Sequence, residues 1–159
     1  MREILNYCGS IPLQDVAGGT ELLTEGANTG HVYILAQGRI EVLRDGTQVT
    51  VIEEPGSLLG EMSVLLGVPH TATVRALGDA KVHVIEDGAV FFRAHPQISW
   101  LVARLLANRL NAATTYLADL KAQYADHGSH LEMVGEVLES LIHQQERDFH
   151  RGSDRDPGH

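Results

Sequence analysis

Residues 55–76 read PGSLLGEMSVLLGVPHTATVRA, a glycine-containing turn followed by a short apolar segment and an alternating one. Gly56 and Gly60 permit tight backbone turns or the close approach of another segment. Residues 61–66 can form a short helix that begins at Glu61, and its first amides would point outward as hydrogen-bond donors. The stretch therefore predicts a compact turn-and-helix unit that is able to hold an anion.

The chain around this stretch, up to residue 95, has the pattern of short β-strands. Most of the 16 glycines lie in this half, and Asp45-Gly46 between two apolar runs is a hairpin signal. Many short strands with glycine at most junctions favour an antiparallel β-roll, a jelly-roll barrel, over a parallel sheet with crossover helices. The expected strands are residues 21–24, 31–36, 38–44, 48–53, 72–76 and 81–85.

The periodicity changes after Asp87. A short apolar segment, residues 88–94, precedes Pro96 and a run over 97–127 without Gly or Pro, which predicts one long helix. Its apolar residues recur at alternating steps of four and three, the spacing of a coiled-coil seam. The helix lies either on the chain's own roll or against a second copy. Its early apolar residues, Trp100, Leu101, Val102 and Leu105, suit packing on the roll, whereas the later, narrower stripe suits a partner helix, so we expect a homodimer. The expected dimer seam is Leu106, Leu110, Ala113, Leu117, Leu120 and Tyr124.

A second, shorter helix is expected after Gly128 interrupts the first. Ser129 and Glu132 have the spacing of a capping box, and apolar residues continue at three- and four-residue steps to Leu141. The last residues are polar and contain Pro and Gly, which is typical of disorder. The expected class is therefore α+β: a roll with its long helix over residues 1–125, an amphipathic helix over 126–148 and a disordered tail over 149–159.

Charge and composition exclude several classes of protein. The chain has 159 residues and a net charge of −9, and residues 1–95 carry 6 Lys and Arg against 12 Asp and Glu, which argues against nucleic-acid binding. No apolar run approaches the roughly 20 residues that cross a bilayer, and the N-terminus has no signal-peptide pattern. We therefore expect a soluble, cytoplasmic protein that contacts neither membrane nor nucleic acid.

The sequence offers no catalytic or metal-binding constellation. Cys8 is the one cysteine, and no nucleophile and base can be paired from their spacing. His127 and His130 have a three-residue spacing that could suit a metal on a helix, but Gly128 interrupts the helix between them. The His-X-His pair of metal-binding β-roll enzymes is absent from the sequence. We expect no enzyme activity, no metal and no cofactor.

Residues 55–76 closely resemble the phosphate-binding cassette of cyclic-nucleotide-binding domains, a family found in catabolite-activator-type regulators, kinase regulatory subunits and nucleotide-gated channels. Upstream, TEGANTGHVYILAQGRIEVL over residues 24–43 resembles that family's strand, turn and strand, with Gly26 and Gly38 in the expected places. The resemblance covers roughly residues 17–125. It implies a regulatory domain in signal transduction that binds cAMP, cGMP or a similar small anion.

The resemblance also implies roles for individual residues. Glu61 would accept the ribose 2′-hydroxyl, position 70 would pair with the cyclic phosphate, and Thr71 would add a further contact. On the long helix, Thr114 matches a residue that reaches the base, although Thr114 and Thr115 could equally be solvated helix residues. The expected ligand-binding residues are Gly60, Glu61, Met62, Ser63, His70, Thr71, Ala72, Thr114 and Thr115.

His70 departs from the family pattern, which has an arginine at this position. A histidine lacks the permanent charge and planar fork of donors of arginine, and only about a quarter of it is protonated at pH 7. Losing a charge-assisted pair costs about 1.5–3 kcal/mol, roughly ten- to a hundred-fold in affinity. Arg75 does not replace it, because residues 70 and 75 fall on opposite faces of an alternating strand.

Two interpretations of function therefore stay open. The first is a small-molecule sensor that binds a cyclic nucleotide weakly and signals through its C-terminal helices to a protein partner. The second is a degenerate, ligand-free interaction domain that keeps the roll as a scaffold. In either case no helix-turn-helix DNA reader is expected after Ser129, because one confident helix remains there.

Overall fold

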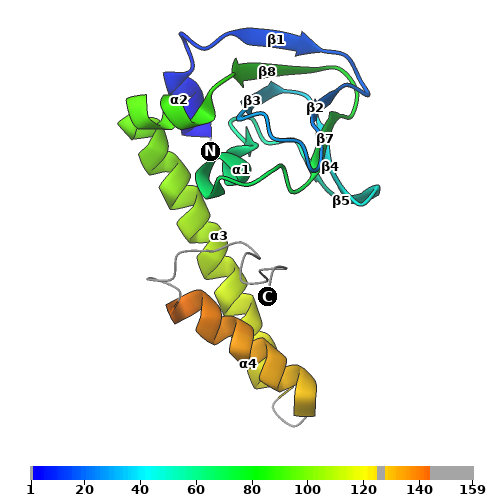
Figure 1. Ribbon diagram of the computed structural model, residues 1–159, viewed down its shortest axis with the longest axis vertical. Helices are drawn as coiled ribbons and strands as arrows, with labels where there is room; N and C mark the ends of the chain where they lie inside the picture. The colour runs from blue at the N-terminus through cyan, green and yellow to red at the C-terminus, as the bar shows by residue number, and fades with distance from the viewer. Residues whose placement is uncertain (1, 125–127, 144–159) are drawn as a thin grey trace, which may run out of the picture. The chain divides into compact units, whose positions relative to one another are not determined.

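The structure, a computed structural model, describes residues 2–124 and 128–143. The chain divides into two compact units, Met1–Leu105 and Leu106–His159. The first unit holds every described strand together with three short helices and the start of a long one (Figure 1). The described part of the chain contains no helix long and apolar enough to cross a membrane.

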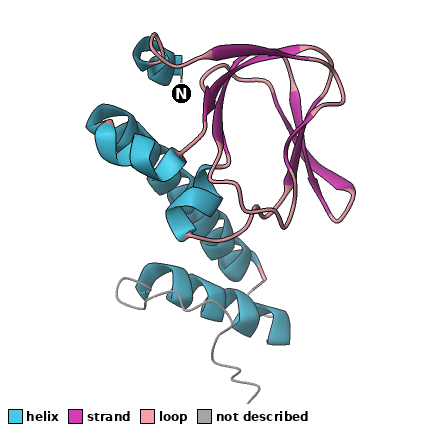
Figure 2. Cartoon of the chain, turned by 45° about the horizontal axis from the view of Figure 1, so that its top comes forward, coloured by secondary structure: helices cyan, strands magenta, loops and turns pink. Residues whose placement is uncertain are grey.

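Eight strands form two four-stranded antiparallel sheets, which face each other as a roll (Figure 2). The strands are β1 (Leu13–Val16), β2 (Glu21–Leu23), β3 (Val32–Gln37), β4 (Ile40–Arg44), β5 (Thr47–Ile52), β6 (Leu58–Leu59), β7 (Thr73–Ala76) and β8 (Ala80–Ile85). One sheet has the order β1-β8-β3-β6 and the other β2-β7-β4-β5. The α+β class and the antiparallel roll expected from the glycine-punctuated alternation are confirmed.

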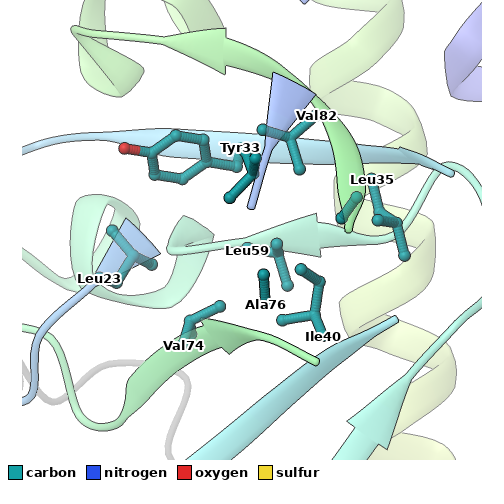
Figure 3. Close-up of a cluster of buried hydrophobic side chains, with 10 residues drawn as sticks. Leu23, Tyr33, Leu35, Ile40, Leu59, Val74, Ala76 and Val82 are labelled. Atoms are coloured by element: carbon teal, nitrogen blue, oxygen red, sulfur yellow. The ribbon is translucent and has the colours of Figure 1, made fainter. Parts of the chain in front are cut away.

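The core of the roll lies between the two sheets (Figure 3). Alternate residues of the strands point inward, because successive side chains of a strand lie on opposite faces. In β7, Val74 and Ala76 are buried whereas Arg75 between them is half-buried. The buried cluster comprises Val16, Leu23, Tyr33, Leu35, Ile40, Leu59, Val74, Ala76, Ala80 and Val82. Burial of this apolar surface is the main stabilising contribution to the roll.

The six strands expected from the sequence are present, with bounds that differ by one or two residues. The Asp45-Gly46 hairpin is confirmed, since both residues have positive φ, 50° and 75°, as a two-residue turn between twisted strands requires. Two strands were missed. Only Val16 of β1 is buried, so no alternation marks it, and β6 is two residues long. The 3₁₀ helix η1 (Arg2–Tyr7) was also missed.

Three α-helices begin within the first unit. Helix α1 (Glu61–Leu66) has the predicted bounds, and α2 (Gly88–Ala94) matches the short apolar segment, with the side chain of Asp87 accepting a hydrogen bond from the Val90 N–H. Helix α3 (Pro96–Gln123) begins at the predicted proline. Val102 is buried as expected, but Trp100 is 67% exposed, so the expectation that it packs on the roll is wrong.

The second unit contains the rest of α3 and α4 (Gly128–His143). Helix α4 begins one residue before the predicted cap Ser129. A Cβ at Gly135 would lie 3.4 Å from the Lys121 Nζ, so α4 runs beside the end of α3. In the expected seam, Leu106, Leu117 and Leu120 are half-buried, and Leu110, Ala113 and Tyr124 are exposed. The predicted helix segment 144–148 and the tail lie outside the described residues.

Candidate functional site

Helix α1 is fixed to the roll by a glycine. Gly60, directly before the helix, has φ 91°, and a Cβ there would lie 2.6 Å from the carbonyl oxygen of His31. Only glycine combines this left-handed conformation with so close a contact. The start of α1 is therefore held against the backbone of the β2–β3 loop.

His70 lies on the segment that returns from α1 to β7. Its backbone N–H donates to the Ala27 carbonyl at 2.8 Å, and its carbonyl accepts from the Gly26 N–H at 2.8 Å. These two bonds join the segment to the β2–β3 loop, and His70 is only 4% exposed. The residue to which the resemblance assigns the phosphate contact is therefore buried.

Both ring nitrogens of His70 have hydroxyl partners. Nδ1 lies 2.9 Å from the Oγ of Ser63 in α1, and Nε2 lies 2.7 Å from the Oγ1 of Thr29 in the β2–β3 loop. The Ser63 hydroxyl also lies 3.2 Å from the Gly60 carbonyl, and Thr29 Oγ1 accepts the His31 N–H. Each hydroxyl can either donate to a ring nitrogen or accept from it, so both ring nitrogens of His70 are satisfied by uncharged partners in either tautomer.

The surroundings of His70 favour its neutral form. Burial lowers the pKa of His70, and the neighbouring His31 lowers this pKa further. Burial disfavours the charged form of a histidine because the imidazolium loses its hydration. His70 therefore supplies hydrogen-bonding groups but no charge to the site at neutral pH.

Arg75 lies on the face of β7 opposite the buried Val74 and Ala76, whereas His70 precedes the strand, so alternation within β7 does not relate the two side chains. Its guanidinium forms an ion pair with Glu41, its cross-strand neighbour in β4, and the Nε to Oε1 distance is 2.6 Å. Gln48 donates to the other Glu41 oxygen at 2.9 Å. The hydrogen bonds from Gln48 and Arg75 lower the pKa of Glu41. The Arg75 guanidinium is therefore paired with Glu41 on the face of the sheet opposite the core.

The remaining expected residues divide into two groups. Around α1, Glu61 and Ser63 are buried, Ala72 is half-buried, and Met62 and Thr71 are exposed. Thr114 and Thr115 belong to the second unit. The Thr114 hydroxyl bonds to the carbonyls of Leu110 and Asn111 in its own helix, both at 3.0 Å, and Thr115 is exposed. Their role toward a ligand stays a prediction.

Sequence reasoning missed Thr29 and His31, which complete the His70 environment. Both lie in the turn before β3, and no spacing links them to residues 60–72. The signal that could have found them is Gly60, because a Cβ there would lie 2.6 Å from the His31 carbonyl, so this contact requires glycine. A Cβ at Gly26 would meet nothing within 4 Å, and Gly26 joins the cassette through the hydrogen bond from its N–H to the His70 carbonyl.

Two cavities of the first unit lie away from these residues. One, of about 540 Å³, is lined by polar and apolar residues at the ends of β1, β3 and β8, among them Asp15, Gln37 and Lys81. The other, of about 340 Å³, is an apolar groove beside α2 that includes Val90 and Phe91. Within the described residues, no group of three or more His, Cys, Asp or Glu could hold a metal ion. His127 and the side chain of His130 lie outside what is described.

Comparison with family models identifies residues 13–92 as a cyclic nucleotide-binding domain. This match covers half of the chain, which therefore belongs to the cyclic nucleotide-binding domain family. The family is one of regulatory binding domains, and the resemblance of residues 55–76 to its cassette is confirmed at the level of the family.

Two full-length relatives are similar at 27% identity. One is a cGMP-dependent protein kinase of Caenorhabditis briggsae, matched over 129 residues, which are 74% of this chain and 17% of the kinase. The other is a CRP-like cAMP-activated global transcriptional regulator of Mycobacterium tuberculosis, matched over 112 residues, 67% of this chain and 50% of the regulator. The chain thus spans half or less of the length of these relatives.

Solved structures share the fold. A cAMP-bound PfPKA-R structure superposes with a TM-score of 0.54 at 21% identity, over 69% of this chain and 37% of that one. The N-terminal domain of a transcriptional regulator from Streptomyces coelicolor superposes with a TM-score of 0.52 at 25% identity, over 70% of this chain and 84% of that one. Both confirm a roll followed by helices.

Proposed function

We propose that the chain is a regulatory sensor domain that binds a cyclic nucleotide, cAMP or cGMP, at the cassette formed by α1 and residues 67–72. Membership of the family supports the ligand class. The contact of Gly60 with the His31 carbonyl supports the location, because it seats α1 against the loop that carries Thr29. The proposed activity is binding, with no catalytic step.

The neutral environment of His70 is the observation that supports our expectation for the affinity of the site for cyclic nucleotides. A cyclic phosphate at this position would find hydroxyl and imidazole groups but no fixed positive charge from residue 70. We expect cyclic-nucleotide affinity at neutral pH to be at least about tenfold weaker than with arginine, because one charge-assisted pair is missing. Glu61 and Thr71 would retain the ribose and phosphate roles that the family implies.

The proposed output is a homodimer joined through the second unit. Leu110 and Tyr124 are 46% and 47% exposed on the same stripe of α3, and such apolar stripes at four- and three-residue steps pair with a second helix. Thr114 and Thr115, which the resemblance assigns to the base, lie on this helix. The helices of the second unit would pass the signal to a protein partner.

A second candidate function is favoured by one observation. The His70 ring already has a hydrogen-bond partner on each nitrogen, and its side chain is 4% exposed. A site closed by its own side chains in this way needs no ligand to be stable. Under this alternative the roll is a ligand-free scaffold, and interaction with a partner protein is its function.

Isothermal titration calorimetry of the purified chain with cAMP and cGMP separates the two functions. The sensor proposal expects saturable binding in the micromolar to millimolar range at pH 7 that weakens when Glu61 is replaced in Glu61→Ala. Leu65→Ala is the matched control, because Leu65 is an exposed residue of α1 that is not among the expected ligand-binding residues. Absence of heat at millimolar nucleotide from a folded protein would overturn the sensor proposal and support the scaffold.

A further inference from the structure

We propose that the cassette prefers an uncharged nucleoside to the corresponding cyclic nucleotide. This inference rests on the proposed function, because membership of the family is what supports a nucleotide-like ligand. It goes further by specifying the charge of the ligand that the site selects. Three features of the first unit carry it: the absence of cations from the segments that build the site, the uncharged hydrogen-bond partners of His70 and the exposure of Thr29.

The segments that build the site contain no permanent cation. Residues 21–38 and 45–74 include the β2–β3 loop, α1 and His70, and neither stretch has a Lys or Arg. Arg75, the first cation after His70, is ion-paired with Glu41 on the other face of β7. The ionisable residue buried in α1 is Glu61, an acid. These segments therefore offer an anionic ligand no countercharge.

The hydrogen-bond partners of His70 are uncharged. Nε2 lies 2.7 Å from the Thr29 hydroxyl and Nδ1 lies 2.9 Å from the Ser63 hydroxyl, and each hydroxyl can donate to the ring or accept from it. Neither hydroxyl carries a negative charge that would stabilise an imidazolium, and burial lowers the pKa of His70. A phosphate beside this ring would therefore be buried without a countercharge.

A neutral ligand meets no such penalty. Burying an anion without a countercharge costs several-fold more than burying a hydroxyl that keeps its hydrogen bonds. Thr29 is the exposed end of the network, and its hydroxyl can exchange hydrogen bonds with a ribose hydroxyl, which both donates and accepts. A nucleoside keeps the base and ribose and presents hydroxyls where the cyclic nucleotide presents its phosphate.

The test is calorimetry at pH 8, where histidine is neutral, on the wild-type chain and two variants. Adenosine is compared with cAMP and guanosine with cGMP at one salt concentration. His70→Arg places a cation in the network, whereas the control Leu65→Arg places the same charge on an exposed position of α1 outside the expected ligand-binding set. We expect wild type and Leu65→Arg to bind one of the nucleosides at least about tenfold more tightly than its cyclic nucleotide, and His70→Arg to lose or reverse that preference.

Each outcome decides separately on the two proposals. Tighter binding of cAMP or cGMP than of its nucleoside by the wild type would overturn the nucleoside preference and leave the sensor function supported. Absence of binding by all four compounds to folded wild type would overturn both. If His70→Arg does not fold, wild-type binding alone still decides, because the preference is defined by the ratio of two affinities of the unmodified protein.

Discussion

The Oγ1 atom of Thr29 lies 2.7 Å from the Nε2 atom of His70, so a loop hydroxyl occupies the ring nitrogen that faces the β2–β3 loop. This bond and the one from Nδ1 to Ser63 tie the loop and α1 together through a single imidazole. The residue that distinguishes this chain from the family pattern is therefore part of the internal structure of its cassette.

The stability of the roll should fall as pH falls below the ordinary histidine range. The pKa of His70 is lowered in the folded state from its ordinary value of 6.5, so the unfolded chain binds this proton more readily. The His70 contribution is therefore fully present above about pH 6.5 and is lost as pH falls through the folded pKa. Urea unfolding from pH 8 to pH 5 should show a steeper loss for wild type than for His70→Gln. Parallel curves would contradict a neutral, buried imidazole.

Gly60→Ala should destabilise the first unit strongly. The substitution forces a left-handed conformation, at about 1–2 kcal/mol, and adds a clash with the His31 carbonyl at 2.6 Å, so we expect a total of about 3 kcal/mol. Gly67→Ala is the matched control, because Gly67 also has positive φ but nothing lies within 4 Å of its Cβ position. Chemical denaturation should give about 1–2 kcal/mol for Gly67→Ala. Equal losses would show that the contact with His31 contributes nothing.

Arg75→Met should lower stability without changing ligand affinity. The substitution leaves the buried carboxylate of Glu41 with Gln48 but without its cation. Because Arg75 lies on the face of β7 opposite the core, cyclic-nucleotide affinity should stay within about twofold of wild type. Thermal unfolding and calorimetry on the same preparation measure the two effects. A large loss of affinity in a folded Arg75→Met would mean that Arg75 serves the ligand.

Leu110→Glu should convert a dimer into a monomer while leaving the roll folded. Leu110 is exposed on the apolar stripe of α3, so a charge there opposes pairing with a second helix. Asn108→Glu is the control, since Asn108 is also exposed but lies on the opposite side of the helix. Light scattering at tens of micromolar measures the mass. A wild-type monomer, or a dimer unchanged by Leu110→Glu, would contradict the proposed seam.

Much of the fold could be predicted because its signals are local. The Asp45-Gly46 turn, the bounds of α1 and α2 and the start of α3 at Pro96 each follow from a few adjacent residues. Strands β1 and β6 could not be predicted, because their pairing with β8 and β3 is set by contacts distant in sequence. The exposure of Trp100 could not be predicted either. Its apolar side chain near the start of α3 suggested packing on the roll, but the residue is 67% exposed.

The site could be predicted only in part, for a related reason. The cassette pattern locates Glu61, Ser63 and His70, and alternation places Arg75 on the other face. Thr29 and His31 join the site through backbone pairing between Gly26 and His70, which no local pattern announces. That the imidazole is buried and satisfied by two hydroxyls depends on this pairing, so the protonation state of His70 could not be derived from its position in the motif.

Cyclic-nucleotide affinity should respond to charge at position 70. Bound phosphate favours the imidazolium and raises its pKa, so the complex takes up a proton and wild-type affinity should rise as pH falls from 8 toward 6. The titratable neighbours of His70 are His31 in the loop and Glu61 at the start of α1, and both stay unchanged in a comparison of variants at position 70. His70→Arg carries a permanent charge, and its affinity should depend little on pH.

The most direct measurement is the affinity of wild type and His70→Arg for cAMP and cGMP by calorimetry at pH 7.5, with folding of both checked by circular dichroism. The account predicts that His70→Arg binds at least one of the two at least about tenfold more tightly than wild type, since it recovers a charge-assisted pair with the phosphate. Failure of a folded His70→Arg to bind either nucleotide at millimolar concentration would contradict a cassette that still receives this ligand class.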